Sequence, residues 1–171
     1  MAADPEALAD PEAVADPEAL ARQICLRMLT VAPRTRAQLA SALARRGVPQ
    51  DVADAVLERF ADVQLVDDAM FARAWVDSRH HGRGLARRAL AAELRQRGVS
   101  VQDIQAAVSR LDSEQETATA RALVERRMES TAGLPIPVRI RRLTGMLARK
   151  GYPGELSYRV VRAALDDHSD G

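Results

Sequence analysis

Apolar residues recur at helical spacing along most of the chain. Pairs of leucines stand four residues apart at 39–43, 90–94 and 143–147, and each pair is followed by a basic residue, a glycine and an apolar residue. Leucines at i and i+4 share one face of a helix, and a basic side chain suits the negative end of the helix dipole. Glycine is the usual residue just past a helix end. Each segment therefore predicts an amphipathic helix that ends at its glycine.

These three segments form a repeat. Gly47, Gly98 and Gly151 are 51 and 53 residues apart. Positions beyond the glycines match as well once one residue is inserted, and among them are three valines: Val56, Val108 and Val160. A period of this size indicates a repeat built from a whole supersecondary unit. We predict three helices in each unit.

Helix-start residues in the first repeat support this division. Asp16 can act as an N-cap with Pro17 at the first helical position. Thr35 and Gln38 have the spacing of a capping box for a second helix, and Pro49 can occupy the first position of a third. The first repeat is therefore predicted to contain three short helices.

The later repeats carry similar punctuation. Asp67 is a natural N-cap for the second repeat, and Ser100 with Asp103 can cap that repeat's last helix. The third repeat is expected to begin near Glu114, with its apolar residues at Ala118, Ala122, Val124 and Met128. Two loops are predicted in these repeats: a flexible basic one at 80–84 and a proline-rich one at 133–137.

The composition favours helices throughout. Hydrophobic residues make up 47% of the chain and aromatic residues only 3%, and the apolar residues are mainly Ala, Leu and Val. We predict an all-α fold in which three tandem three-helix repeats form an elongated, curved body. The predicted parts are a disordered acidic tail at 1–16, repeats at 17–64, 65–113 and 114–167, and a disordered C-terminus at 168–171.

The N-terminal tail repeats a hexad. The sequence Asp4-Pro-Glu-Ala-Leu-Ala recurs from Asp10, with Val in place of Leu, and again from Asp16. Proline every six residues prevents one continuous helix, so we expect the first two copies to be disordered. The tail is either a solubilising extension or an internal mimic that screens the basic body.

The net charge of +1 conceals an uneven distribution. Residues 1–20 contain six acidic residues and no basic one, which leaves 25 basic residues against 24 − 6 = 18 acidic residues in the rest of the chain. Such a basic body indicates a polyanionic partner or an acidic protein surface. The candidate residues for binding DNA or an acidic protein surface are twelve basic residues of the second and third repeats: Arg79, Arg83, Arg87, Arg88, Arg95, Arg139, Arg141, Arg142, Arg149, Lys150, Arg159 and Arg162.

The helix around residues 87–95 of the second repeat is predicted to have an apolar face and a basic face. Leu90 and Leu94 point inward, while Arg87, Arg88 and Arg95 lie on the opposite face of the same helix. We expect these arginines to have no role in the fold and to face a partner. Trp75 is expected in the core and not as a platform for base stacking.

Catalytic chemistry is absent from the pattern. There is no Gly-rich phosphate loop, no serine elbow and no metal-ligand spacing, and the adjacent His80 and His81 would face different ways on a helix. Cys25 lies between apolar neighbours and is expected to be a small core residue. No run is long enough to span a membrane. We predict a cytoplasmic, monomeric binding protein that is not an enzyme and has no cofactor or metal.

One segment carries a family resemblance. The sequence Leu65-Val-Asp-Asp-Ala-Met-Phe-Ala-Arg-Ala-Trp-Val-Asp-Ser-Arg79, placed between the Gly47 and Gly98 helices, resembles the bacterial RecX family. The resemblance covers about residues 20–167. It implies three tandem three-helix repeats and a negative regulator of the recombinase RecA. Such a regulator is expected to lodge in the groove of the RecA filament on single-stranded DNA and to block filament extension, ATP hydrolysis and strand exchange.

Gln64 departs from the pattern of that family, which usually has glycine at this position. If the backbone there has positive φ, glutamine costs about 1 kcal/mol relative to glycine.

Three hypotheses for function remain. In the first, the repeats span neighbouring RecA subunits, and the faces around Arg88 and Arg141 meet acidic protein surface or DNA phosphate. In the second, the chain binds single- or double-stranded DNA independently of RecA, because three-helix units with a basic helix resemble helix-turn-helix modules. In the third, the chain is a scaffold, for which charge reversal at Arg141 and Arg142 changes nothing.

Overall fold

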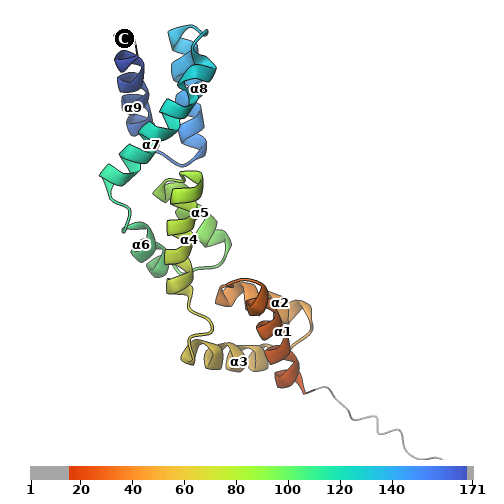
Figure 1. Ribbon diagram of the computed structural model, residues 1–171. Helices are drawn as coiled ribbons and strands as arrows, with labels where there is room; N and C mark the ends of the chain where they lie inside the picture. Colours follow the sequence, from red (N-terminus) through yellow and green to blue (C-terminus); the bar gives the residue numbers. More distant parts are fainter. Residues whose placement is uncertain (1–15, 169–171) are drawn as a thin grey trace, which may run out of the picture. The chain divides into compact units, whose positions relative to one another are not determined.

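The structure of the chain is a computed structural model that describes residues 16–168. These residues form nine α-helices and one short 3₁₀-helix, and no strand occurs among them (Figure 1). The predicted all-α fold is therefore confirmed. Of the predicted acidic tail only Asp16 is described, and of the predicted C-terminus only His168 is described, so both predictions lie outside the described residues.

The chain divides into two compact units between Asp67 and Asp68. The first unit contains one three-helix repeat and the second contains two. The helices of the first unit are α1 (Pro17–Val31), α2 (Arg36–Arg45) and α3 (Gln50–Asp62). Those of the second unit are α4 (Asp68–Arg83), α5 (Arg87–Gln96), α6 (Val101–Val108), α7 (Ser113–Met128), η1 (Glu129–Thr131), α8 (Ile136–Arg149) and α9 (Gly154–Asp167).

The predicted caps open the helices. The Asp16 carboxylate accepts a hydrogen bond from the N–H of Glu18 at 3.1 Å, and Pro17 is the first residue of α1. Thr35 and Gln38 form both bonds of a capping box. These starts are predictable because each depends on atoms within three residues of the helix end.

Of three further helix starts, one is as predicted and two differ slightly from prediction. The Ser100 hydroxyl accepts from the N–H of Asp103 at 3.1 Å, as predicted for α6. Pro49 is the N-cap of α3, so the helix begins at Gln50, one residue later than predicted. The proline-rich segment is only partly a loop, because α8 begins at Ile136 and includes Pro137 in its first turn, where a missing N–H costs nothing.

The repeat glycines end the second helix of each repeat in the left-handed conformation. The φ angles are +75° at Gly47, +75° at Gly98 and +90° at Gly151. In each repeat the residue after the glycine donates its N–H to the carbonyl oxygen of the second leucine, as in a Schellman motif. These bonds are Val48 to Leu43 at 3.1 Å, Val99 to Leu94 at 3.2 Å and Tyr152 to Leu147 at 3.1 Å. The repeated sequence is therefore a repeated helix end.

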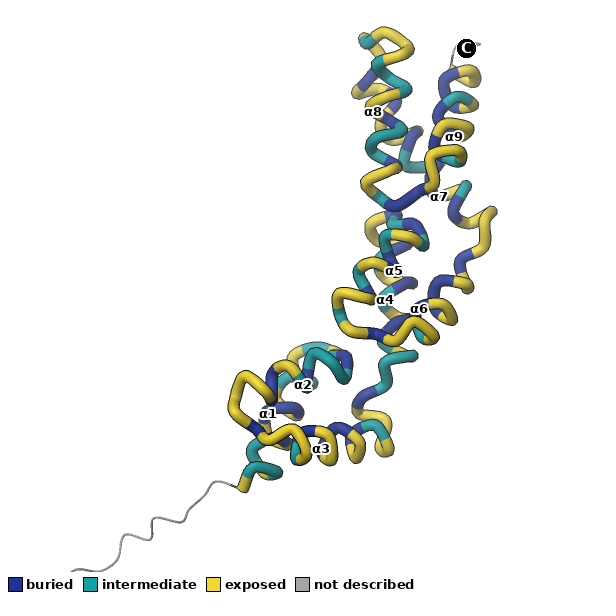
Figure 2. Tube along the Cα trace, turned by 180° about the vertical axis from the view of Figure 1, so that it is seen from behind, coloured by how far each residue is buried: buried dark blue, intermediate teal, exposed yellow. Residues whose placement is uncertain are grey.

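Each repeat has a buried core (Figure 2), and the core of the third repeat also includes Ala86 of the second. The leucine pairs of the repeat lie in these cores and are almost completely buried: Leu39 and Leu43, Leu90 and Leu94, Leu143 and Leu147. Cys25 is fully buried in the first core, and burial raises the pKa of its thiol. The expectation that Cys25 is a core residue is confirmed.

The predicted flexible loop at 80–84 is wrong. Helix α4 continues to Arg83, and His80 is buried in its last turn. The His80 Nδ1 atom lies 2.9 Å from the carbonyl oxygen of Leu85, and its Nε2 atom lies 3.0 Å from Oγ1 of Thr119 on α7. Because a histidine with two partners is acceptable in the interior, the helix can extend through this segment.

The predicted apolar stripe of the third repeat's first helix is also wrong in part. Val124 and Met128 are buried, but Ala118 is exposed and Ala122 is half-buried. The buried face of α7 runs instead through Glu116 and Ala120. The stripe was assigned wrongly because Glu116 is buried, whereas a carboxylate is expected at the surface unless its partner is known.

Gln64 has φ = +59°, and no other non-glycine residue between 16 and 168 has positive φ. The residue follows α3, and its N–H donates to the carbonyl oxygen of Ala61 at 2.9 Å. The backbone at Gln64 therefore has the conformation in which glutamine is less favourable than glycine.

Replacing Gln64 with glycine is expected to raise the free energy of unfolding by about 1 kcal/mol, because glycine adopts positive φ without the Cβ clash. Chemical denaturation followed by circular dichroism measures the change. Gln23→Gly, at an exposed position inside α1 of the same unit, is the matched control and should lower the free energy by about 1 kcal/mol. Equal destabilisation by both changes would contradict the prediction.

Candidate functional site

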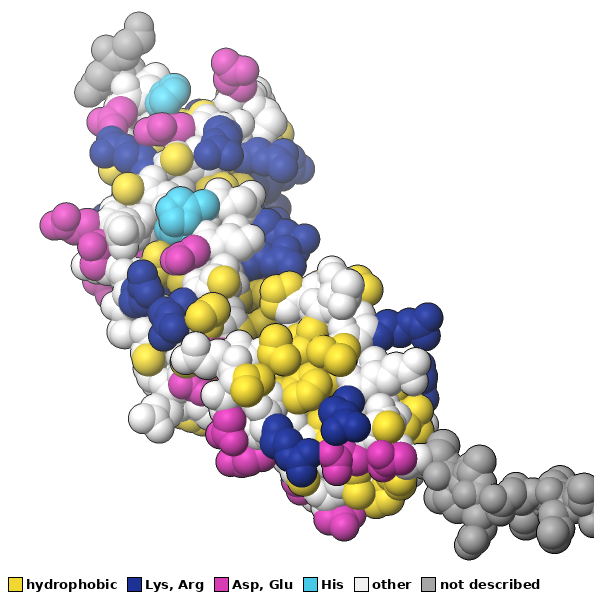
Figure 3. All heavy atoms as spheres, turned by 60° about the horizontal axis from the view of Figure 1, so that its bottom comes forward, with side chains coloured by type: hydrophobic (Ala, Val, Ile, Leu, Met, Phe, Trp, Pro, Cys, Tyr) yellow, Lys and Arg dark blue, Asp and Glu magenta, His cyan; other side chains and the backbone are white. Residues whose placement is uncertain are grey.

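A basic pocket of about 470 Å³ lies in the third repeat, between the end of α7, η1 and α8. Four arginines line it: Arg127, Arg141, Arg142 and Arg149. Ser130 and Thr131 of η1 add two hydroxyl groups, and Leu143 and Met146 add apolar surface. Figure 3 shows several basic side chains along one edge of the second unit, on the face that it displays.

The amphipathic pattern of α8 places these arginines. Leu143 and Leu147 face the core, so Arg141 and Arg142 project from the exposed part of the helix. Arg149 follows Arg142 by seven residues, or two helical turns, and lies on the same side. The short η1 segment then turns the chain so that Arg127, at the end of α7, lines the same pocket.

The four guanidinium groups of the pocket have no ion-pair partner among residues 16–168. Among the ion pairs of the described residues, none joins a carboxylate oxygen within 4.0 Å to any of these arginines. Four positive charges around one concave surface concentrate a positive potential. Guanidinium groups bind carboxylate and phosphate through paired hydrogen bonds. The pocket is therefore suited to an anionic group of a partner.

Arg139 lies beside the pocket but serves the fold. Its Nε atom lies 3.3 Å from Oγ1 of Thr131, and a guanidinium nitrogen lies 3.8 Å from the sulfur of Met128. The Thr131 hydroxyl in turn donates to the carbonyl oxygen of Met128 at 3.0 Å. Arg139 thus ties the start of α8 to η1 and helps to position the pocket wall.

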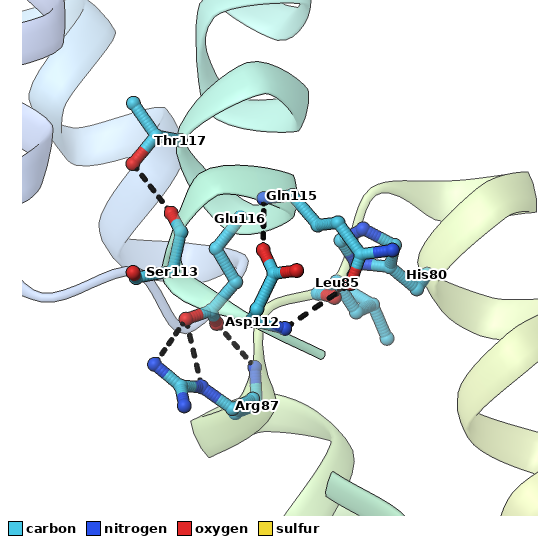
Figure 4. Close-up of polar contacts among 8 residues, drawn as sticks. All are labelled: His80, Leu85, Arg87, Asp112, Ser113, Gln115, Glu116 and Thr117. Carbon is cyan, nitrogen blue, oxygen red and sulfur yellow. Dashed lines mark hydrogen bonds and ion pairs between the residues drawn. The ribbon is translucent and has the colours of Figure 1, made fainter. Parts of the chain in front are cut away.

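Arg87 also has a structural role, so the expectation that it has none is wrong. Its Nε and Nη2 atoms lie 2.8 and 2.7 Å from Oε2 of Glu116, and its backbone N–H donates to Oε1 at 2.8 Å (Figure 4). The Glu116 side chain is 4% exposed and the Arg87 side chain 43%. This ion pair joins α5 of the second repeat to α7 of the third.

Lys150 and the backbone at Arg83 belong to the same junction. The Lys150 Nζ atom donates to the carbonyl oxygen of Arg83 at 2.7 Å, and the Tyr152 hydroxyl donates to that of Gly84 at 2.8 Å. The N–H of Ala86 donates to the carbonyl oxygen of Lys150 at 2.9 Å. Burial, and then the charge of Glu116, raise the pKa of Tyr152. Its hydroxyl therefore remains protonated and can keep donating.

Arg79 packs on the indole of Trp75. Its guanidinium carbon lies 4.3 Å from the ring centre, and that of Arg97 lies 3.7 Å from it. The Trp75 Nε1 atom donates to the carboxylate of Glu93 at 2.8 Å. Trp75 is half-buried and packs against the second core, so its predicted core position is only partly correct.

The structure separates the other predicted basic residues. Arg88 and Arg95 are exposed on α5, and Arg159 is exposed on α9. Arg162 lies 3.6 Å from Asp166 on the same helix. Only Arg141, Arg142 and Arg149 of the predicted set line the pocket. Arg127 was not predicted, because it lies on α7 and reaches the pocket only through the turn at η1.

Neither a metal site nor a membrane helix is found in the described part of the chain. Between residues 16 and 168 there is no group of three or more His, Cys, Asp or Glu side chains placed to hold a metal ion. None of the described helices has both the length and the apolar composition needed to cross a bilayer.

Three consecutive family models match the chain, in the order of its repeats. They are the first, second and third three-helix domains of RecX, and they match residues 21–60, 67–108 and 114–161. The chain belongs to the RecX family. This confirms the family predicted from the segment around Trp75.

Curated members of the RecX family are close in sequence. The chain is 64% identical over 146 residues to Regulatory protein RecX of Thermobifida fusca, covering 85% of this chain and 79% of the relative. It is 58% identical over 150 residues to Regulatory protein RecX of Streptomyces coelicolor, covering 88% and 80%.

A solved structure agrees in fold. The crystal structure of RecX from Lactobacillus salivarius superposes with a TM-score of 0.80 at 15% sequence identity, covering 88% of this chain and 97% of that chain. At this identity the likeness supports the shared fold alone.

Proposed function

We propose that this RecX-family chain is a negative regulator of the RecA recombinase. It binds the RecA filament on single-stranded DNA and inhibits filament extension, ATP hydrolysis and strand exchange. The observation that carries the proposal is the in-order match of all three RecX domains, together with 64% identity to a protein named Regulatory protein RecX. Regulation is by binding and not by catalysis.

The basic pocket is the part of the chain that we assign to this contact. Its four arginines offer paired donors on a concave surface. The hydroxyl groups of Ser130 and Thr131 already donate to backbone carbonyl oxygens of α7. The pocket thus supplies hydrogen-bond donors and positive charge. Its lining residues do not pair a nucleophile with a general base. The partner group is a carboxylate on the filament surface or a phosphate of its DNA, and both fit a guanidinium.

The test is the DNA-dependent ATPase of RecA with this protein titrated in. The unmodified chain is expected to lower the rate, and the double variant R141E/R142E is expected to need on the order of tenfold more protein for the same inhibition. The reason is that reversing a charge at a contact turns attraction into repulsion, and a tenfold loss corresponds to about 1.4 kcal/mol.

The control for that assay is R73E/R110E, which makes the same charge change at two exposed arginines outside the pocket. It should inhibit RecA like the unmodified chain. Circular dichroism should show that both double variants remain folded. An ATPase rate unchanged by a stoichiometric excess of the unmodified chain would contradict the proposal itself.

An independent helical DNA-binding protein is the second candidate. It is favoured by the position of α8, the strongly basic second helix of a three-helix unit. Binding to an oligonucleotide that weakens steeply with salt, without any response of RecA, would support it.

A further inference from the structure

A second pocket lies in the first unit, between α1 and α2, with a volume of about 260 Å³. Apolar and basic side chains line it in about equal number: Leu20, Ile24 and Met28, with Arg27, Arg45 and Arg46. The apolar residues belong to the edge of the first core, and the three arginines are exposed. We call this surface the α1–α2 groove.

The arginines of the groove are not neutralised by the described residues of the unit. Other arginines of the unit are paired: Arg22 and Arg59 with Glu18, and Arg36 with Glu58. None of the ion pairs found between residues 16 and 168 includes Arg27, Arg45 or Arg46. An apolar groove with an unneutralised basic rim is complementary to an acidic segment that also carries apolar residues.

The chain contains such a segment directly before α1. The hexads that start at Asp4 and Asp10 each carry two acidic residues and one larger apolar residue, Leu8 or Val14. Residues 1–15 contain no basic residue. These residues therefore match the groove: their acidic side chains suit its arginines, and their apolar side chains suit its apolar surface.

The third copy of the hexad shows how this sequence packs on the unit. Asp16 caps α1, and Glu18 pairs with Arg22 at 3.0 Å and with Arg59. Leu20 is half-buried against the first core, and Ala21 is fully buried. A hexad therefore supplies one carboxylate for an arginine and a pair of apolar residues for the core edge.

We propose that residues 4–15 dock in the α1–α2 groove of their own chain. Their carboxylates lie against Arg27, Arg45 and Arg46, and Leu8 and Val14 cover the apolar residues of α1. The chain is long enough, because 12 residues extend about 40 Å, whereas α1 rises only about 17 Å from Pro17 to Met28. Attachment to the same chain gives a local concentration near the millimolar range, so weak contacts suffice.

This docking screens the basic charge of the first unit from other anions, and added salt releases it. The contact does not depend on RecA, so its test is separate from that of the proposed function.

Paramagnetic relaxation in the full chain tests the proposal. A nitroxide on Ala9→Cys, in a Cys25→Ala background, is expected to broaden the backbone amide signals of α1 and of the C-terminal half of α2. The broadening should be lost in the double variant R27E/R46E and at high salt. It should persist in R73E/R110E, which makes the same charge change in the second unit.

A second variant keeps the test decisive if R27E/R46E fails to fold. The change D4N/E6Q/D10N/E12Q removes the charge of the tail and leaves the folded unit untouched, and it should also abolish the broadening. Three results would overturn the proposal: no broadening at the groove, equal broadening over all basic surfaces, or broadening that disappears when labelled chain is diluted with unlabelled chain. The last result would mean that the tail binds a second copy.

Discussion

Replacing Arg87 with alanine is expected to lower the free energy of unfolding of the second unit by about 3 kcal/mol or more. The change leaves the Glu116 carboxylate, which is 4% exposed, without its cationic partner. Removing one member of a buried ion pair costs more than the pair contributes, because the remaining charge is not hydrated. Only the backbone N–H of residue 87 would still donate to that carboxylate.

Removing the other partner of the ion pair tests whether the loss of stability comes from the unpaired buried carboxylate. Glu116→Ala leaves Arg87, whose side chain is already 43% exposed and can bind water. We expect a smaller loss, about 1 to 2 kcal/mol, mainly from the unsatisfied N–H. Chemical denaturation followed by the fluorescence of Trp75, the single tryptophan of the chain, reports on this unit. Arg88→Ala, at the exposed neighbouring position, should change stability by less than about 0.5 kcal/mol. Equal losses for Arg87→Ala and Glu116→Ala would refute the argument.

The change Gly151→Ala should destabilise the chain by about 3 kcal/mol, compared with about 1 kcal/mol for Gly47→Ala. Both glycines have positive φ, so alanine brings the same backbone strain at each. A Cβ atom at 151 would also lie 2.6 Å from the backbone nitrogen of Ala89 and 2.7 Å from its Cβ, whereas one at 47 meets nothing within 4 Å. The backbone of α5 must move to relieve this overlap.

Gly47→Ala is thus the control that isolates the strain of φ from the clash at the junction. Denaturation followed by circular dichroism measures both variants, and Trp75 fluorescence should follow the loss only in Gly151→Ala. Similar losses in the two variants would show that Gly151 is required for its backbone conformation alone.

Much of the fold was predictable because its determinants are local. The caps at Asp16, Thr35 and Ser100 each depend on atoms two or three residues away, and the leucine pairs fix the buried face of each second helix. The family pattern singled out Gln64 as a departure from glycine, and the structure gives this residue positive φ.

The errors concern residues whose partners are distant in the sequence. Glu116 can be buried because it pairs with Arg87, which lies 29 residues earlier in the sequence. His80 can be buried because it bonds Thr119, which lies 39 residues later. Without those partners, a carboxylate and a histidine are expected at the surface or in a loop.

The candidate site divides in the same way. The periodicity of α8 identifies Arg141, Arg142 and Arg149 as members of one exposed face. It gives no reason to add Arg127, which reaches the pocket only through the turn at η1. Nor does it separate Arg139, whose guanidinium is used inside the repeat, from its exposed neighbours.

The three repeats are not interchangeable modules. All three end their second helix with the same glycine cap, but only the third follows the glycine with a tyrosine, whose hydroxyl donates to the carbonyl oxygen of Gly84 in the preceding repeat. Val48 and Val99 stand at the corresponding positions and have no group that can make this bond. A chain assembled by duplicating or permuting these repeats would lose this hydrogen bond and the Arg87–Glu116 ion pair, because both need the second and third repeats to be neighbours in this order.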